Sequence, residues 1–251
     1  MDRVPTGISG LDELMEGGIP RGRTILLTGA CGTGKSISAM QFVYQGALAY
    51  KEPGIYVTFD ERPDLLRQDA LRFGWNLKSL EDAGLLRIVD ATIGKVGLAS
   101  EEKYSLKSDE FDLDRLILEI MSHAKDLKAR RIVIDSIPSL SFRFKDSADV
   151  RNAILKLTFA LMKTGLTSIM VSEIDEGAQG LSKFGVEEFV ADGVIVLHYI
   201  GGLGTHGGRT LLVRKMRATK HSEEIHSLQI SDAGASVRPG FEDGKDPLAR
   251  F

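Results

Sequence analysis

The sequence predicts an α/β fold with a mostly parallel central sheet that is flanked by helices on both faces. Strand-like apolar runs alternate with helix-like segments along most of the 251 residues, and parallel strands need helical crossovers to connect them. The strand-like runs are almost continuously apolar, as expected for strands buried on both faces. A chain of this length can bury roughly three quarters of its unfolded surface, which suits one large domain.

The first half of the chain contains two strand and helix pairs. Residues 6–22 read as a short helix between glycine turns, followed by an apolar strand at 24–28, a glycine-rich loop and a helix. A second strand is expected at 54–59 and a second helix from 63 to about 73. Each helix should bury one apolar stripe. The expected inward residues are Ile37, Met40, Tyr44, Ala47 and Leu48, then Leu65, Leu66, Ala70 and Phe73.

The second half continues the alternation and then changes. Further strands are expected at 85–89, 131–135, 167–172 and 193–198, and helices at 113–127 and 148–163. The strands at 209–214 and 225–230 follow without a helix between them, which predicts an antiparallel C-terminal extension of the sheet. We expect one domain over 1–231 and a flexible tail over 232–251, which is rich in glycine, proline and charge. The polar segment 94–111 is too long for an ordinary connection and is read as a surface excursion or a mobile flap.

The loop after the first strand fits the pattern G-x-x-x-x-G-K-[ST]. Glycines let backbone N–H groups approach an anion, and the N-terminus of the following helix adds a favourable partial charge. A nucleoside triphosphate is therefore the expected ligand, with Lys35 on the β- and γ-phosphates and the Ser36 hydroxyl on Mg²⁺. The loop consists of Gly29, Ala30, Cys31, Gly32, Thr33, Gly34, Lys35 and Ser36.

An acid that ends a later strand is the second candidate metal ligand. The run at 131–134 is apolar and ends in Asp135, the form of a Walker B element. Ligands collect at the carboxyl edge of a parallel sheet, where an aspartate can hold Mg²⁺ through its water shell. A strand that ends in aspartate is weak evidence alone, but this one follows the phosphate loop by about a hundred residues.

Two adjacent acids, Asp60 and Glu61, leave the second strand. Hydrolysis requires a group that orients water in line with the γ-phosphate, and a carboxylate can do this. We assign this role to Glu61, with Asp60 supporting it or the metal shell. The alternative is that one of the two acids caps the helix that begins near Pro63.

The most basic stretch of the chain lies at 214–221. Side chains on a strand repeat every two residues, so Lys215 and Arg217 should point the same way. If their target is the γ-phosphate held by a neighbouring subunit, they act as a trans finger, a device worth 10³ to 10⁵ in rate in other NTPases. The alternative is a solvated basic edge that protects a strand against aggregation.

Composition restricts the functional classes. The net charge of −3, from 32 basic and 35 acidic residues, provides no general attraction to nucleic acid or anionic lipid. No apolar run approaches the length of a membrane span, and no signal-peptide core is seen at the N-terminus. The single cysteine, Cys31, cannot form an intramolecular disulfide. These features predict a cytoplasmic protein that does not act at a membrane.

Together these motifs resemble the single-domain relatives of the circadian clock ATPase KaiC, within the RecA-like P-loop ATPases. The resemblance extends from the N-terminal region to about Ser231. It rests on TGISGLD at 6–12, GGIPRG at 17–22, the phosphate loop, TFDE at 58–61, FGW at 73–75, IDS at 134–136, FGVEEFVAD at 184–192 and KMRATKH at 215–221.

The resemblance implies a RecA-like fold and a homo-oligomeric, hexameric ring with ATP and Mg²⁺ between subunits. Lys35 and Ser36 would lie on one side of each site, and Lys215 and Arg217 would reach it from the next subunit. The family usually has two glutamates after the second strand, so Glu61 is the matched base, whereas Asp60 departs from the pattern. The resemblance further implies slow ATP hydrolysis in a regulatory or signalling role with an unidentified protein partner.

One difference from the clock protein concerns autophosphorylation. Its phosphorylated half has adjacent serine and threonine residues where this chain, aligned by eye, has Glu187 and Glu188. A carboxylate does not accept a phosphoryl group stably. The resemblance therefore implies an ATPase without clock-type autophosphorylation.

The main alternative is a single-stranded DNA-binding ATPase in DNA repair, similar to RecA and RadA paralogues. The segment 139–145 interleaves Phe142 and Phe144 with Arg143 and Lys145, a combination that can stack bases and contact phosphate. The loop 173–188 is acidic, which would repel phosphates, so any binding should be weak and salt-sensitive. A nucleotide-sensing scaffold with negligible turnover is a further alternative, because Asp60 departs from the family pattern.

Overall fold

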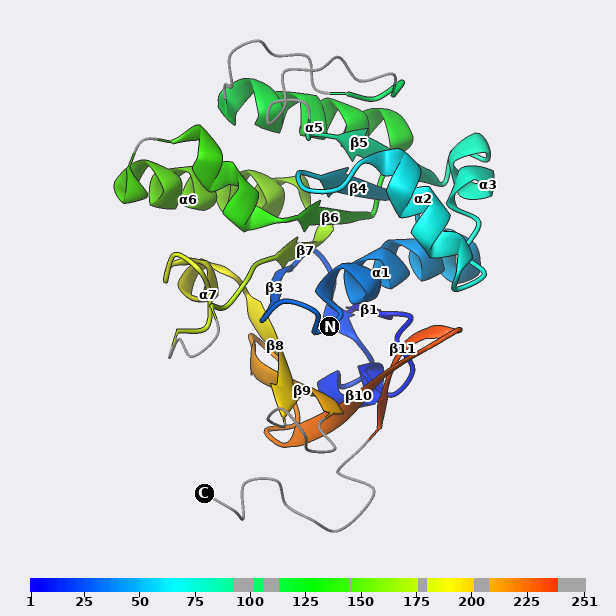
Figure 1. The fold of residues 1–251 in the computed structure, drawn as a ribbon, viewed down its shortest axis with the longest axis vertical. Helices are drawn as coiled ribbons and strands as arrows, with labels where there is room; N and C mark the ends of the chain where they lie inside the picture. Colours follow the sequence, from blue (N-terminus) through cyan, green and yellow to red (C-terminus); the bar gives the residue numbers. More distant parts are fainter. Residues whose placement is uncertain (93–101, 106–112, 145, 176–179, 201–207, 239–251) are drawn as a thin grey trace.

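A mixed β-sheet crosses the whole molecule, and helices cover both of its faces (Figure 1). The computed structural model describes residues 1–92, 102–105, 113–144, 146–175, 180–200 and 208–238. In this part of the chain the strand order is β11-β10-β9-β8-β3-β7-β6-β4-β5. The strands are β3 (Thr24–Gly29), β4 (Gly54–Thr58), β5 (Leu86–Asp90), β6 (Arg131–Asp135), β7 (Thr167–Val171), β8 (Gly193–Ile200), β9 (Gly208–Met216), β10 (Ile225–Ser231) and β11 (Gly234–Arg238).

The sheet is parallel from β8 to β5, and β9, β10 and β11 extend it in antiparallel fashion. The predicted α/β class, with its antiparallel C-terminal extension, is therefore confirmed. The first long strand, β3, lies between β7 and β8, which come much later in the chain. A separate two-stranded sheet pairs β1 (Arg3–Val4) with β2 (Ile19–Pro20).

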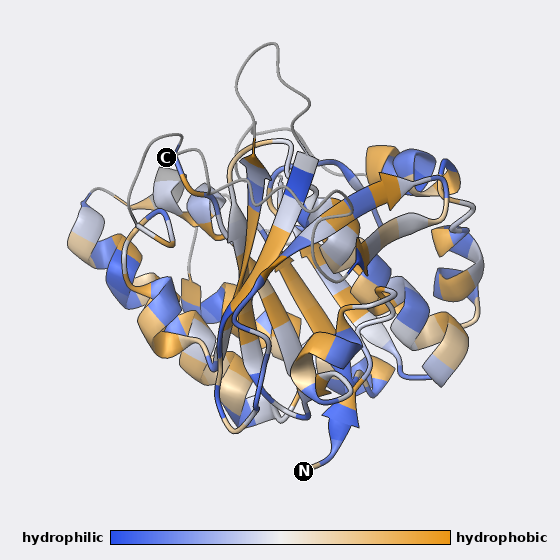
Figure 2. Ribbon diagram, turned by 90° about the horizontal axis from the view of Figure 1, so that it is seen from below, coloured by the Kyte–Doolittle hydropathy of each residue, from blue (hydrophilic) through white to orange (hydrophobic). Residues whose placement is uncertain are grey.

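Two apolar clusters fill the space between the sheet and its helices. On one face, α1 (Lys35–Tyr50), α2 (Pro63–Leu71), α3 (Leu77–Asp82) and the 3₁₀ turn η1 (Asp12–Met15) contribute to one cluster. On the other face, α5 (Leu113–Leu127), α6 (Ser147–Thr164) and the 3₁₀ segment η2 (Ile137–Arg143) contribute to the second. The short helix α7 (Glu187–Val190) precedes β8. The strands are largely apolar along their length, as expected for a sheet covered on both faces (Figure 2).

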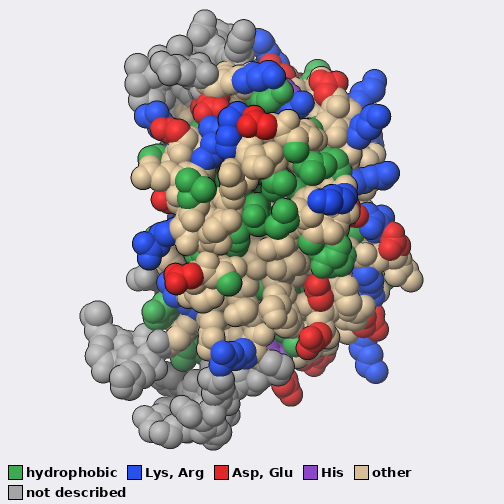
Figure 3. Space-filling model, turned by 90° about the vertical axis from the view of Figure 1, so that its right-hand side faces the viewer, with side chains coloured by type: hydrophobic (Ala, Val, Ile, Leu, Met, Phe, Trp, Pro, Cys, Tyr) green, Lys and Arg blue, Asp and Glu red, His purple; other side chains and the backbone are tan. Residues whose placement is uncertain are grey.

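Two residues expected to face inward do not. Leu48 near the end of α1 and Leu65 near the start of α2 are 44% and 45% exposed. Single exposed apolar residues are normal on protein surfaces, and apolar side chains appear among charged ones on the side of α2 and α3 (Figure 3). Helical spacing predicted which face of each helix is buried but overestimated the width of that buried face.

The prediction of a flexible tail over 232–251 was wrong for the first residues of that range. Gly234–Arg238 forms the edge strand β11, paired with β10. Gln41 in α1 anchors this strand, because its amide donates to the Ala235 carbonyl at 3.1 Å and accepts from the Ala235 N–H at 2.7 Å. The same amide nitrogen donates to the Gly7 carbonyl at 2.9 Å. One buried side chain in the helix after the phosphate loop thus holds segments from near both ends of the described chain.

The long polar segment 94–111 lies mostly outside the described residues, so the proposed excursion or flap is not addressed. Its described part, 102–105, contacts the domain. Arg67 in α2 binds Glu102 at 2.7 Å and Glu81 at 2.7 Å, and Arg87 lies 4.2 Å from the centre of the Tyr104 ring. In the described parts of the chain, no helix is both long and apolar enough to cross a membrane.

Candidate functional site

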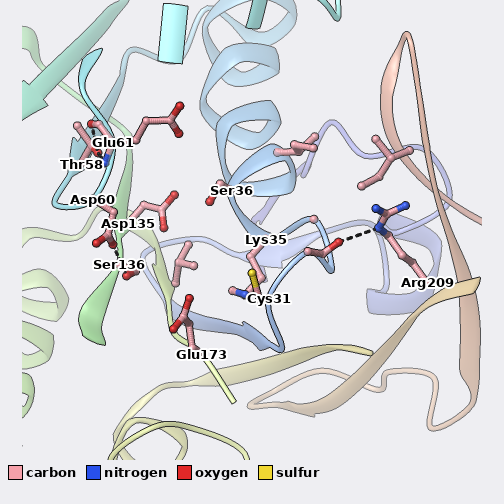
Figure 4. A pocket seen from close by; sticks show the side chains of 15 residues that line it. Cys31, Lys35, Ser36, Thr58, Asp60, Glu61, Asp135, Ser136, Glu173 and Arg209 are labelled. Atoms are coloured by element: carbon pink, nitrogen blue, oxygen red, sulfur yellow. Dashed lines mark hydrogen bonds between the residues drawn. The ribbon is translucent and has the colours of Figure 1, made fainter. Parts of the chain in front are cut away.

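A pocket of about 460 Å³ opens at the carboxyl ends of β3, β4, β6 and β7 (Figure 4). This is the edge at which open α/β sheets bind ligands. The lining comes from the phosphate loop, the ends of the three neighbouring strands and the antiparallel extension. The lining residues are Cys31, Gly32, Gly34, Lys35, Ser36, Ile37, Thr58, Asp60, Glu61, Asp135, Ser136, Val171, Glu173, Arg209 and Ile230.

Contacts within the protein hold the phosphate loop in shape without a ligand. Gly34, with φ +101°, immediately precedes α1, and a Cβ on it would lie 2.6 Å from Cδ1 of Ile230, so only glycine fits without a shift. Thr33 Oγ1 donates to the Ala30 carbonyl at 2.8 Å, and Lys35 Nζ donates to the same carbonyl at 2.9 Å. Gly29, Ala30 and Thr33 are not among the residues that line the pocket.

The buried Lys35 side chain carries the loop's positive charge. Burial lowers the pKa of its ammonium group below the ordinary value, and the nearby Glu173 carboxylate opposes that shift. A ligand phosphate could replace the Ala30 carbonyl as the acceptor for this ammonium group. The exchange would pair a buried cation with an anion, which is the more favourable arrangement.

Asp135 ends β6 inside the pocket, as predicted, and only 9% of it is exposed. The Tyr56 hydroxyl donates to Asp135 Oδ2, and the Ser36 side chain is a second hydrogen-bonding neighbour of this carboxylate. Burial raises the pKa of Asp135, and both hydrogen bonds oppose that shift. The predicted pair of metal ligands, Ser36 and Asp135, is therefore brought together.

These two oxygen donors fit a magnesium ion. Mg²⁺ is usually held by one or two protein oxygens together with substrate phosphates and water, rather than by a complete protein cage. In the described residues no group of three or more His, Cys, Asp or Glu side chains forms a ready metal cluster. A hydroxyl and a carboxylate beside a phosphate loop are the donor set that a nucleotide-bound Mg²⁺ requires.

The adjacent acids after β4 have different surroundings. Asp60 accepts hydrogen bonds from the Ser136 hydroxyl at 2.6 Å and from the Ser139 hydroxyl, so it links the ends of β4 and β6. Glu61 lines the pocket, and Thr58 Oγ1 holds its backbone N–H and carbonyl at 3.1 and 2.6 Å. The helix-capping alternative is wrong, because the N-cap of α2 is Arg62 and no side chain caps it.

Burial raises the pKa of Glu61 above its ordinary value, and the negative charges of Asp69 and Asp135 add to that shift. A carboxylate whose pKa is moved toward neutrality is a better proton acceptor at physiological pH. The environment of Glu61 therefore suits a general base, whereas Asp60 is suited to fixing the local backbone.

Sequence reasoning missed two charged lining residues. Arg209, at the start of β9, donates from Nε to the Gly32 carbonyl at 3.0 Å and so supports the phosphate loop from the antiparallel extension. Glu173 follows β7 at the same edge of the sheet as Asp135. The rule that found Asp135, an acid just after an apolar strand, could have found Glu173. No local pattern marks Arg209, because its contact depends on how β9 folds back.

The structure places Lys215 and Arg217 outside this pocket. Lys215 Nζ donates to the backbone carbonyls of Ala191 at 2.7 Å and Glu188 at 2.9 Å. Arg217 Nη1 lies 3.4 Å from Asp192 Oδ1. Both side chains thus lie at the end of α7, on the same side as predicted, but neither reaches the phosphate loop of its own chain.

The two glutamates at the start of α7 also lie away from the pocket lining. Glu187 is fully buried and accepts hydrogen bonds from Ser172 Oγ at 3.0 Å and Ser182 Oγ at 2.7 Å. Ser182 also donates to Glu188. Glu187 therefore joins the end of β7 to α7.

The central parallel strand, the glycine-rich loop, the helix after it and the acid at the end of a neighbouring strand define the P-loop class of α/β domains. The family model described as ATPase: KaiC matches residues 4–242. The crystal structure of a KaiC-like protein from the hyperthermophilic archaeon Pyrococcus horikoshii is similar to this structure with a TM-score of 0.82 and 39% identity, and the match covers 95% of this chain and 99% of that one. The chain belongs to the KaiC family of ATPases, as the sequence motifs predicted.

Curated relatives show how the chain compares in length. A UPF0273 protein of Pyrococcus furiosus is 40% identical over 237 residues, which cover 94% of both chains. The circadian clock oscillator protein KaiC of Thermostichus vulcanus is 38% identical over 237 residues, which cover 94% of this chain but 44% of that protein. The chain thus spans less than half of the clock protein and nearly all of the archaeal relative. Family membership implies nucleotide binding and suggests ATPase activity.

Proposed function

We propose that this protein binds ATP with Mg²⁺ and hydrolyses it slowly to ADP and phosphate in a regulatory role. The observation that carries the proposal is the convergence of Lys35, Ser36, Glu61 and Asp135 on one pocket at the carboxyl edge of the sheet. These residues come from α1 and from the ends of β4 and β6, so their meeting depends on the whole fold. Each has the chemistry that phosphoryl transfer to water requires.

The mechanism assigns one task to each group. Backbone N–H groups of the phosphate loop and the Lys35 ammonium bind the phosphate oxygens, while Ser36 and Asp135 hold the Mg²⁺, which neutralises charge on the phosphates when bound. Glu61 orients a water molecule and accepts its proton as the water oxygen bonds to the γ-phosphorus. The bond between the γ-phosphorus and the β,γ-bridging oxygen breaks, and that oxygen leaves with ADP. The proton passes from Glu61 to the released phosphate.

A second subunit completes the site in this proposal. Lys215 and Arg217 cannot serve their own pocket from their position at the end of α7. Lys215 and Arg217 lie on one surface of the subunit, and the pocket lies on another. When these two different surfaces bind each other, subunits join head to tail, and the assembly closes into a ring when the rotation per subunit allows it. We propose a homo-oligomeric ring, hexameric as the family resemblance suggests, in which Lys215 exchanges its α7 carbonyls for the γ-phosphate of the neighbour.

Two activities are less well supported. Glu187 and Glu188 lack the hydroxyl that stable autophosphorylation needs, so we propose no clock-type autokinase. For single-stranded DNA binding, Phe144 packs against the apolar core, and the Lys183 ammonium is paired with Asp175 Oδ2 at 2.7 Å. These contacts engage an aromatic ring and an ammonium group that the two candidate loops would need for binding a nucleic acid. We propose that a protein partner recognises whether ATP or ADP is bound.

The test is ATP turnover by the wild type and by Glu61→Gln. Removing the base should lower the turnover number about 10²- to 10⁴-fold with little change in nucleotide affinity. Glu13→Gln makes the same chemical change at an exposed position outside the pocket and should retain wild-type turnover. Equal turnover by wild type and Glu61→Gln would contradict the proposed base, and absence of ATP binding by the wild type would contradict the proposal as a whole.

A further inference from the structure

The buried hydroxyl of Tyr56 contacts the candidate site but has no role in the proposed hydrolysis. Tyr56 lies in β4 with no exposed surface, and it does not line the pocket. In the register of the sheet, Tyr56 pairs with Val133 and Thr58 pairs with Asp135. Tyr56 and Asp135 are therefore two residues apart along adjacent parallel strands, and their side chains lie on the same face.

The rest of the Tyr56 side chain is surrounded by apolar neighbours. Its ring belongs to the cluster between the sheet and α1, where a phenylalanine would fill the same space. The hydroxyl donates to Asp135 Oδ2, and the Ser36 side chain lies nearby. The hydroxyl thus contacts one proposed ligand of the divalent cation and lies close to the other.

The Tyr56 hydroxyl is the donor in this contact, because an ionised carboxylate has only acceptor oxygens. Its one proton is directed to Oδ2 of Asp135, so Oδ1 is left for the metal or its water shell.

We propose that Tyr56 is a positioning residue for the divalent cation, because its hydroxyl fixes the Asp135 carboxylate in the orientation that binds a nucleotide-bound Mg²⁺. The proposal rests on the proposed function and deepens it. Groups that hold metal ligands in this way typically change metal affinity 10- to 100-fold when they are removed.

The experiment measures binding of a fluorescent, slowly hydrolysed ATP analogue, first in EDTA and then in a Mg²⁺ titration. Tyr56→Phe should bind the analogue in EDTA as the wild type does, and its half-saturating Mg²⁺ concentration should rise 10- to 100-fold. Tyr44→Phe is the matched control, since it removes one hydroxyl from another buried tyrosine whose neighbour is the Asn76 backbone, outside the pocket. It should leave the Mg²⁺ titration unchanged.

Loss of the hydroxyl deprives the buried Asp135 carboxylate of the Tyr56 donor, which can prevent folding. The double variant Tyr56→Phe/Asp135→Asn removes both partners and is compared with Asp135→Asn alone. The proposal predicts the same Mg²⁺ response for these two variants, because Tyr56 acts through Asp135.

The possible failures are distinguishable. If Asp135→Asn weakens the Mg²⁺ response but Tyr56→Phe matches the wild type, the positioning role is overturned and the proposed function stands. A further 10-fold loss in the double variant relative to Asp135→Asn would overturn the route through Asp135. If Mg²⁺ does not tighten nucleotide binding by the wild type, both the inference and the metal site of the proposed function are overturned.

Discussion

Two variants that are each inactive should regain activity when they assemble together, if each ATP site is shared between subunits. Lys35→Ala removes the cation of the phosphate loop, and Lys215→Ala removes the cation that lies outside its own pocket. Loss of a trans finger is expected to lower turnover by about 10³-fold or more. In a ring assembled from equal amounts of the two variants, a pocket works when its own chain has Lys35 and its neighbour has Lys215.

The expected recovery follows from that geometry. Each condition holds with a probability of one half, so about a quarter of the pockets should be complete in a head-to-tail ring. The assay mixes dissociated chains, assembles them with ATP, verifies the oligomer by sizing and measures phosphate release. Activity should approach about a quarter of the wild-type value per chain.

A third variant provides the matched control. Lys35 and Glu61 line the same pocket of one chain, so a mixture of Lys35→Ala and Glu61→Gln should contain no complete site and remain inactive. Recovery in that mixture, or none in the mixture of Lys35→Ala with Lys215→Ala when both are in the ring, would refute the shared site. A monomer in both ATP and ADP would refute it as well.

Three further predictions use single residues as probes. Cys31, the only cysteine of the sequence, is exposed in the phosphate loop, so saturating ATP should slow its alkylation at least about 10-fold, and equal rates with and without ATP would contradict nucleotide binding there. Hydrolysis should be lost as the pH falls through the raised pKa of Glu61; Asp69→Asn removes a charge that raises this pKa and should move the acid limb of the rate profile to lower pH, whereas an unmoved limb would argue against Glu61 as the titrating base. Gly234 has φ +103°, and a Cβ there would lie 2.4 Å from Cζ2 of Trp75, so Gly234→Ala should destabilise the fold by about 2–5 kcal/mol. Denaturant unfolding followed by the fluorescence of Trp75, the only tryptophan, measures this change, and an unaltered midpoint would contradict the close packing.

Local patterns predicted most of the elements because each element satisfies its own periodicity. The apolar run of β6 and the amphipathic stripe of α5 were expected with the bounds that the structure has, Arg131–Asp135 and Leu113–Leu127. The edge strand β11 was missed because it begins with glycine and contains small residues, which resemble a tail. What makes it a strand is its contact with Gln41, over 190 residues earlier.

The sequence predicted those site residues that lie just after the end of a strand. It did not predict residues that reach the site through contacts with distant parts of the chain. Lys35, Glu61 and Asp135 lie close to the ends of their strands in sequence, and all three line the pocket. Arg209 and Tyr56 contribute through contacts with residues far away in the sequence, so no window of sequence around either residue indicates its partner. The same limit applies to Lys215, whose alternation with Arg217 predicted a shared direction but not its contact with the carbonyls after Glu187.

The central position of β3 has a consequence for synthesis of the protein. Both of its neighbours, β7 and β8, leave the ribosome about 140 residues or more after it, which corresponds to roughly 7 to 30 s at typical rates of translation. Throughout that time an apolar strand followed by a glycine-rich loop lacks both of its native neighbours. The supports of the loop, Arg209 and Ile230, emerge later still. A nascent chain of this protein therefore becomes competent to bind nucleotide only when it is nearly complete, and until then the apolar strand β3 is a target for chaperones.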